Sequence, residues 1–175
     1  MRTFPTILAL ALLILTNLTA GRLDIAVIQF PGEKTPEGLA TAFAGVNLSE
    51  ITNANRTITK EPCLQGGYVL YAQCMTATPG TTVRSATRIK DSRADIEGRL
   101  GSGSLSVAIS LMEGVKAGLR SFEKKNYAGS GPLPAGVPRV LSIKQIHRKS
   151  SSVVKGQAGI EHSNLTTVVV AQYTP

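Results

Sequence analysis

Four side chains have the chemistry of a general acid–base site. His147 and His162 are the only histidines in the chain, and Asp95 and Glu97 are carboxylates close in sequence. A histidine held within hydrogen-bond reach of a carboxylate can act as the general base of a hydrolase. The chain has neither a Gly-x-Ser-x-Gly elbow nor a His-Glu-x-x-His motif, which mark the familiar hydrolase classes. The four residues are therefore candidates for an atypical hydrolase site.

The spacing of the two histidines also bears on metal binding. If the last two strands pair around residues 154 and 155, His147 faces His162, and the imidazoles could begin a metal site or a pH-sensitive pair. A turn at 156–157, which contains a glycine, instead moves His162 opposite Ser151. Glycine favours a turn, so we expect the second register, in which the two histidines are not opposite each other. We therefore expect neither a metal site nor a cofactor.

Charged and apolar residues alternate between positions 82 and 100. This period of two predicts an antiparallel hairpin, turning at Asp91-Ser92, with one buried face and one charged face. In the predicted register Ile96 lies on the buried face, and Arg84 faces Arg99 across the strands. The charged face carries Arg84, Arg88, Lys90, Arg93 and Arg99. We name these five residues the basic face and predict that they bind an anionic partner.

The first twenty residues have the pattern of a secretory signal. Arg2 is followed by an apolar run from Ile7 to Leu15 and by small or polar residues at Asn17, Thr19 and Ala20, with Leu18 departing from the small residue usual at its position. A helix of that length is too short to cross an apolar layer of about 30 Å, so cleavage is expected. The sequence thus predicts a signal peptide over 1–20, a single domain over 21–175, and a periplasmic, cell-envelope or secreted protein without a membrane span after cleavage.

Two cysteines, Cys63 and Cys74, belong to a chain bound for an oxidising compartment. A disulfide between them is the usual outcome there. A simple hairpin turning at residues 65–67 would nevertheless hold them about 20 Å apart, whereas bridged Cα atoms lie within about 7 Å. Both a bridge and two free thiols remain compatible with the sequence.

Residues 26–32, "AVIQFPG", resemble the first strand and turn of the glutaminase subunit of purine biosynthesis, a class I glutamine amidotransferase. That resemblance implies a nucleophilic cysteine in a Gly-x-Cys-x-Gly elbow and a late His-x-Glu pair. Here Cys63 sits in "EPCLQGG", Cys74 sits in "AQCMT", and the comparable pair is reversed as Glu161-His162. The resemblance is therefore confined to one strand and its turn.

The periodicity of apolar residues predicts which helices and strands carry these residues. A helix over 36–46 is indicated by Thr35 as N-cap and Pro36 at the first helical position. A second helix over 104–125 is indicated by an apolar stripe at helical spacing, followed by a Gly/Pro loop over 128–138. Strands are predicted over 23–30, 55–61, 68–76, 139–149 and 163–174, besides the hairpin.

The resulting order is β-α-β-β-β-β-α-β-β. It predicts an α+β domain with two helices packed on a mixed, largely antiparallel sheet. Residues 23–76 and 93–173 each follow the order βαββ, which suggests a duplicated unit. This order resembles that of small periplasmic domains of bacterial outer-membrane assembly factors.

The charge of the chain indicates which classes of partner it could bind. The formal net charge is +8, and it falls to +7 when Arg2 leaves with the signal. The chain has no tryptophan and few aromatic residues, so a nucleic-acid stacking surface is not expected. We expect a non-enzymatic binding or assembly module whose partner is an anionic envelope or extracellular polymer, or a protein. The alternative is the secreted hydrolase described above.

The signal predicts the start of the mature protein. Protein purified from the exported fraction of its host should begin at or within a few residues of Gly21, because the small residue Ala20 directly before it suits signal peptidase. Intact-mass measurement tests this expectation. A mature protein that retains Met1 would contradict it.

Overall fold

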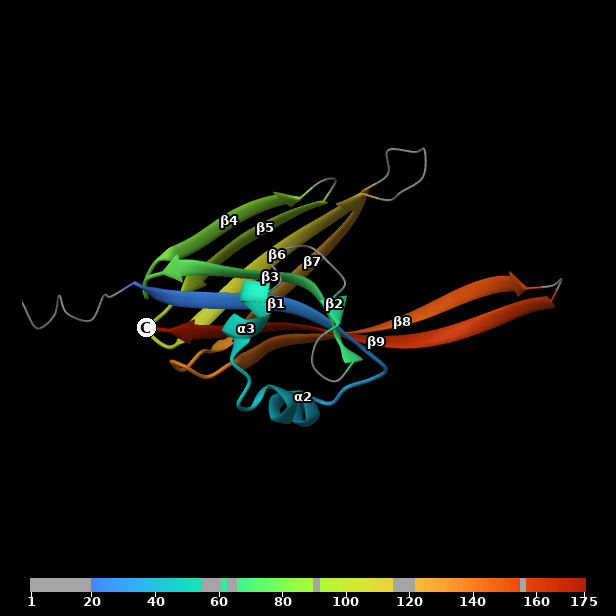
Figure 1. Cartoon of the computed structure of the whole chain (residues 1–175), viewed down its shortest axis with the longest axis horizontal. Coiled ribbons are helices and arrows are strands. Elements are labelled where there is room, and N and C mark those ends of the chain that lie inside the picture. Colours follow the sequence, from blue (N-terminus) through green and yellow to red (C-terminus); the bar gives the residue numbers. More distant parts are fainter. Residues whose placement is uncertain (1–19, 55–60, 63–65, 90–91, 115–121, 155–156) are drawn as a thin grey trace, which may run out of the picture.

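The computed structural model describes residues 20–54, 61–62, 66–89, 92–114, 122–154 and 157–175. Two antiparallel sheets lie face to face, and two short helices cover the outer side of one of them (Figure 1). The fold is α+β but mostly β, and it has two sheets where the sequence predicted a single mixed one. Neither helix has the length or the apolar run needed to cross a membrane, as far as the described residues go.

We call the first sheet the covered sheet. Its strand order is β2-β3-β1-β9-β8, and every described pairing between these strands is antiparallel. Its strands are β1 (Gly21–Pro31), β2 (Glu61–Pro62), β3 (Tyr68–Ala77), β8 (Arg139–Val154) and β9 (Gln157–Thr174). The β8–β9 hairpin continues past the other strands as an arm (Figure 1).

We call the second sheet the open sheet. It is an antiparallel meander in the order β4-β5-β6-β7. Its strands are β4 (Thr82–Ile89), β5 (Ser92–Leu100), β6 (Ser104–Gly114) and β7 (Phe122–Pro132).

The helices α2 (Pro36–Phe43) and α3 (Leu48–Ala54) lie between β1 and β2 in the chain. Thr35 caps α2 by accepting a hydrogen bond from the Gly38 backbone N–H at 3.1 Å. Leu39 and Phe43 are buried against the covered sheet, and the rings of Phe30 and Phe43 meet edge to face at 6.3 Å. The helices therefore bury one side of the covered sheet.

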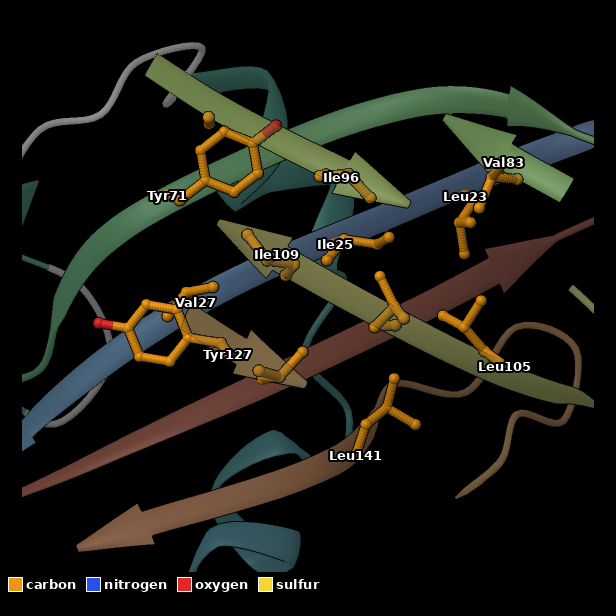
Figure 2. Packing of buried hydrophobic residues seen from close by; sticks show 14 of the residues in the cluster. Leu23, Ile25, Val27, Tyr71, Val83, Ile96, Leu105, Ile109, Tyr127 and Leu141 are labelled. Carbon is orange, nitrogen blue, oxygen red and sulfur yellow. The ribbon is translucent and has the colours of Figure 1, made fainter. Parts of the chain in front are cut away.

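The main core lies between the two sheets. Leu23, Ile25 and Val27 of β1 point toward Leu105 and Ile109 of β6 (Figure 2). All five side chains are at most 1% exposed. Aliphatic side chains thus supply most of this core, as expected for a chain without tryptophan.

Several sequence predictions are confirmed. The strands expected over 23–30 and 68–76 are β1 and β3, and the helix expected from residue 36 is α2. The strands expected over 139–149 and 163–174 are present, but they extend to residues 154 and 157. The hairpin over 82–100 is present as β4 and β5.

The predicted helix over 104–125 is wrong in its described part. Residues 104–114 form β6, and residues 122–125 begin β7. Leu105, Val107, Ile109 and Leu111 recur at every second position and are all buried, so the strand period explains the burial better than the helical one. Without this helix, the predicted duplicated βαββ unit does not form.

Three smaller predictions also differ from the structure. The loop expected over 128–138 is strand up to Pro132. Of the strand expected over 55–61, residues 55–60 lie outside the described residues, and α3 was not predicted. The hairpin register is shifted by two residues, so that Arg84 faces Glu97 rather than Arg99. A shift by two keeps every side chain on its predicted face.

The buried face of the hairpin gives a stability prediction. Ile96 is 3% exposed, so Ile96→Asp would bury an unpaired charge and should unfold the domain. Arg88 is exposed on the opposite face, and Arg88→Ala should change the free energy of unfolding by less than about 0.5 kcal/mol. Thermal melts test both variants. A larger loss for Arg88→Ala would show that the faces are assigned the wrong way round.

The buried phenol of Tyr71 gives a pH prediction. Burial raises its pKa from 10.0 to about 12. The unfolded chain therefore loses this proton first, and the free energy of unfolding should fall by about 1 kcal/mol between about pH 9.5 and pH 11. Tyr71→Phe should remove that fall, whereas Tyr68→Phe, at an exposed tyrosine, should keep it. Chemical denaturation at the two pH values makes the comparison, and equal slopes in both variants would contradict the assignment.

Candidate binding face on the open sheet

The side of the open sheet that faces away from the core is exposed, and no described element packs on it. We call it the outer face. Charged residues cluster on β4 and β5, and short side chains follow on β6 and β7. The outer face carries Thr82, Arg84, Ala86, Arg88, Arg93, Asp95, Glu97, Arg99, Ser104, Ser106, Ala108, Ser110, Met112, Lys124, Asn126, Ala128, Ser130 and Pro132.

The short side chains form rows across the sheet. Ala108 lies opposite Ala128, and Ser106 lies opposite Ser130. A shallow groove of about 640 Å³ runs over the row of Ala108 and Ala128. Alanine and serine stabilise exposed strand positions less than threonine or valine would, so strand stability does not explain these rows. Short side chains do allow another molecule to approach the backbone closely.

Two ion pairs partly neutralise the outer face. Arg84 Nη2 lies 2.6 Å from Glu97 Oε1, and Arg93 Nε lies 2.9 Å from Asp95 Oδ2. All four side chains are more than a third exposed, so each pair contributes only about 0–1 kcal/mol. The pairs are therefore readily exchanged for contacts with a partner.

Four members of the basic face lie together on the outer face, as predicted. Arg88 and Arg93 are directly opposite each other, and Arg99 lies opposite Thr82. Arg88 and Arg99 have no carboxylate partner among the described side chains. The fifth member, Lys90, lies outside the described residues. The outer face thus retains unpaired positive charge beside β4.

A polar corner joins the two sheets next to this face. Gln73 of β3 donates a hydrogen bond to Ser85 at 2.5 Å, and the Thr87 hydroxyl donates to Gln73 Oε1 at 3.4 Å. The Tyr71 hydroxyl also donates to Gln73. A groove of about 260 Å³ opens at this corner. Its lining residues are Thr52, Ala72, Gln73, Cys74 and Thr87.

The candidate catalytic residues are not brought together. His147 Nδ1 lies 2.8 Å from Asn164 Oδ1 on the covered sheet, whereas Asp95 and Glu97 pair with arginines on the open sheet. The β8–β9 register places His162 opposite Lys149 rather than opposite His147 or Ser151. Among the described residues, no group of three or more His, Cys, Asp and Glu could hold a metal ion.

The disulfide prediction cannot be placed fully in the structure, because Cys63 lies outside the described residues. Cys74 is half-buried and is not bridged to any described residue. It lies opposite Asp24 in the β1–β3 pairing. The bridge therefore stays a prediction.

The rows of short side chains were not predicted from the sequence. Their signal was the alternation of residues 105–111, where Ser106, Ala108 and Ser110 separate buried aliphatic residues. Assigning this segment to a helix hid the alternation, since the same residues then fall on several helix faces. The half of the outer face that β6 and β7 form was therefore not predicted from the sequence.

No protein-family model matches the chain, and no curated protein sequence matches it. Solved secretins are structural neighbours. The type II secretin GspD of enteropathogenic Escherichia coli has a TM-score of 0.38 and 9% identity, covering 97% of this chain and 73% of that one. Aeromonas hydrophila ExeD gives 0.38 and 11%, covering 97% and 52%.

The type III secretion injectisome secretin InvG of Salmonella gives a TM-score of 0.32 and 9% identity, covering 98% of this chain and 70% of that one. The neighbours are thus secretins of type II and type III secretion systems. With TM-scores below 0.5, the likeness does not establish a shared fold.

Proposed function

We propose that the protein is an exported, non-enzymatic binding or assembly module of the periplasm, cell envelope or extracellular space, and that its outer face is the contact surface. The observation that carries this proposal is the composition of that face. Arginines without carboxylate partners on β4 and β5 border rows of alanine and serine on β6 and β7.

The chemistry of the face selects a class of partner. Guanidinium groups bind carboxylates, sulfates and phosphates through paired hydrogen bonds. Arg88 faces Arg93 directly, and like charges in that position are mildly unfavourable. An anionic group between them would relieve the repulsion. The partner is therefore an anionic polymer or an acidic protein surface.

The short side chains favour association for a different reason. Ordering a long side chain at an interface costs about 0.5–1.5 kcal/mol, and alanine has no rotamer freedom to lose. Ala86, Ala108 and Ala128 are exposed and can be covered without that cost. The same face thus supplies charge at one side. At the other side it supplies a flat contact area whose burial costs little side-chain entropy.

Retention on heparin and on anionic liposomes tests the proposal. Arg88→Ala/Arg99→Ala should elute at lower salt than wild type, and the slope of log retention against log salt should fall by about two. Arg139→Ala/Lys144→Ala is the matched control, because it removes two exposed charges from β8 of the other sheet. Glu97→Gln should raise retention, since it releases Arg84.

The control variant distinguishes binding through the outer face from binding through the overall charge of the protein. If both double variants lose retention equally, overall charge alone explains binding and the outer face is not the contact surface. Unchanged retention of the Arg88/Arg99 variant would also overturn the proposal.

A further inference from the structure

The fourth strand offers an open edge at the side of the outer face. β4 pairs with β5 and, within the described parts of the chain, with no other strand. Figure 1 shows it as the outermost ribbon of the open sheet. Alternate residues of an antiparallel edge strand direct both backbone groups away from the sheet. β4 therefore presents N–H and C=O groups that could pair with a further strand.

Two of the other described edges, β7 and β8, carry features that discourage such pairing. On β7, Lys125 points inward and pairs with Glu123 at 3.4 Å, and the strand ends at Pro132. Charges pointing inward and proline are common protections of edge strands. On the covered sheet, β8 is irregular between Val140 and Ser142, whereas β2 covers only Tyr68 and Val69 of β3. β4 has neither proline nor an inward charge.

The two sides of β4 differ in chemistry. Arg84 and Arg88 project on the outer face, whereas Val83, Ser85 and Thr87 project inward. The corner groove of about 260 Å³ is lined in part by Thr87, so there is space beside the inward side. An added strand would place alternate side chains next to arginines and next to small, partly apolar side chains.

We propose that β4 accepts an extended, acidic segment of a partner protein as an additional strand. The segment alternates Asp or Glu, placed beside Arg84 and Arg88, with small or β-branched residues placed toward Val83 and Thr87. Backbone hydrogen bonds provide affinity in this mode, and the alternating side chains provide specificity. This inference rests on the proposed function, because it names the partner of the same basic region.

Charge decides between this occupant and a second copy of the chain. Antiparallel pairing of β4 with β4 of another molecule would bring Arg84 and Arg88 beside the same arginines of the copy. Like charges on neighbouring strands are destabilising. An acidic strand turns both positions into favourable cross-strand pairs.

Two peptides of equal composition test the inference. The probe is an eight-residue, end-capped peptide that alternates Glu with Val and Thr. The control has the same residues in blocks, four Glu followed by Val-Thr-Val-Thr, so its charge is equal but only two of its four acids can lie on one face of a strand. Fluorescence anisotropy at low salt should show the alternating peptide binding about tenfold tighter.

Protein variants and hydrogen exchange locate the contact. Arg84→Glu/Arg88→Glu should weaken the alternating peptide at least about tenfold. Lys124→Glu on the opposite edge of the same face should change binding less than about threefold. Amide exchange in residues 82–89 should slow when the alternating peptide binds, because edge amides acquire partners.

The outcomes separate this inference from the proposed function. Equal binding of both peptides, without protection of β4, would overturn strand addition while leaving the basic region as an anion-binding surface. Heparin retention without binding of either peptide would do the same. If the wild-type protein neither is retained on heparin nor binds either peptide, both this inference and the proposed function are overturned. A wild-type dimer in sedimentation that Arg84→Glu/Arg88→Glu abolishes would assign the edge to a second copy and overturn the acidic partner.

Discussion

The burial of β1 on both of its sides is the constraint on which the rest of the structure depends. β1 lies between β3 and β9, so the first strand holds the last one in place. Leu23, Ile25 and Val27 fill the core between the sheets, while Ala26 and Ile28 pack under the helices. Because a strand alternates its side chains, one apolar run supplies two cores.

Asp24 is the exception in this apolar run, and its partners explain why it is tolerated. It is 1% exposed, accepts hydrogen bonds from Arg22 Nε at 2.9 Å, and accepts another from Thr52 of α3 at 2.5 Å. A buried carboxylate is costly unless it is paired and hydrogen-bonded. Here the cost is offset by contacts that tie α3 to β1, so the same residue fixes how the covered sheet meets its helices.

An element could be predicted from the sequence when the residues that determine it are close together in the chain. It could not be predicted when contacts between distant segments determine it. β1 and α2 were predicted because an apolar run and a capped Pro36 act within a few residues. β6 satisfied both a helical and a strand period, and only its packing against β1 decides between them. The end of β7, residues 128–132, was predicted as a loop from its glycines, but a Cβ atom at Gly129 would lie 2.8 Å from Leu141 Cβ. Glycine is needed there because β7 passes close to β8, which no local pattern could reveal.

The candidate face illustrates the same distinction. Its arginines were predicted, because a register error of two residues leaves side chains on the same face. Its alanines and serines were not, because they belong to the strands read as helix and loop. Both halves share one property: Arg88 opposite Arg93 and Ala108 opposite Ala128 are poor choices for holding strands together. Folding is secured instead by the core on the other side of the same strands. A sheet stabilised from one side can carry on its other side residues suited to binding.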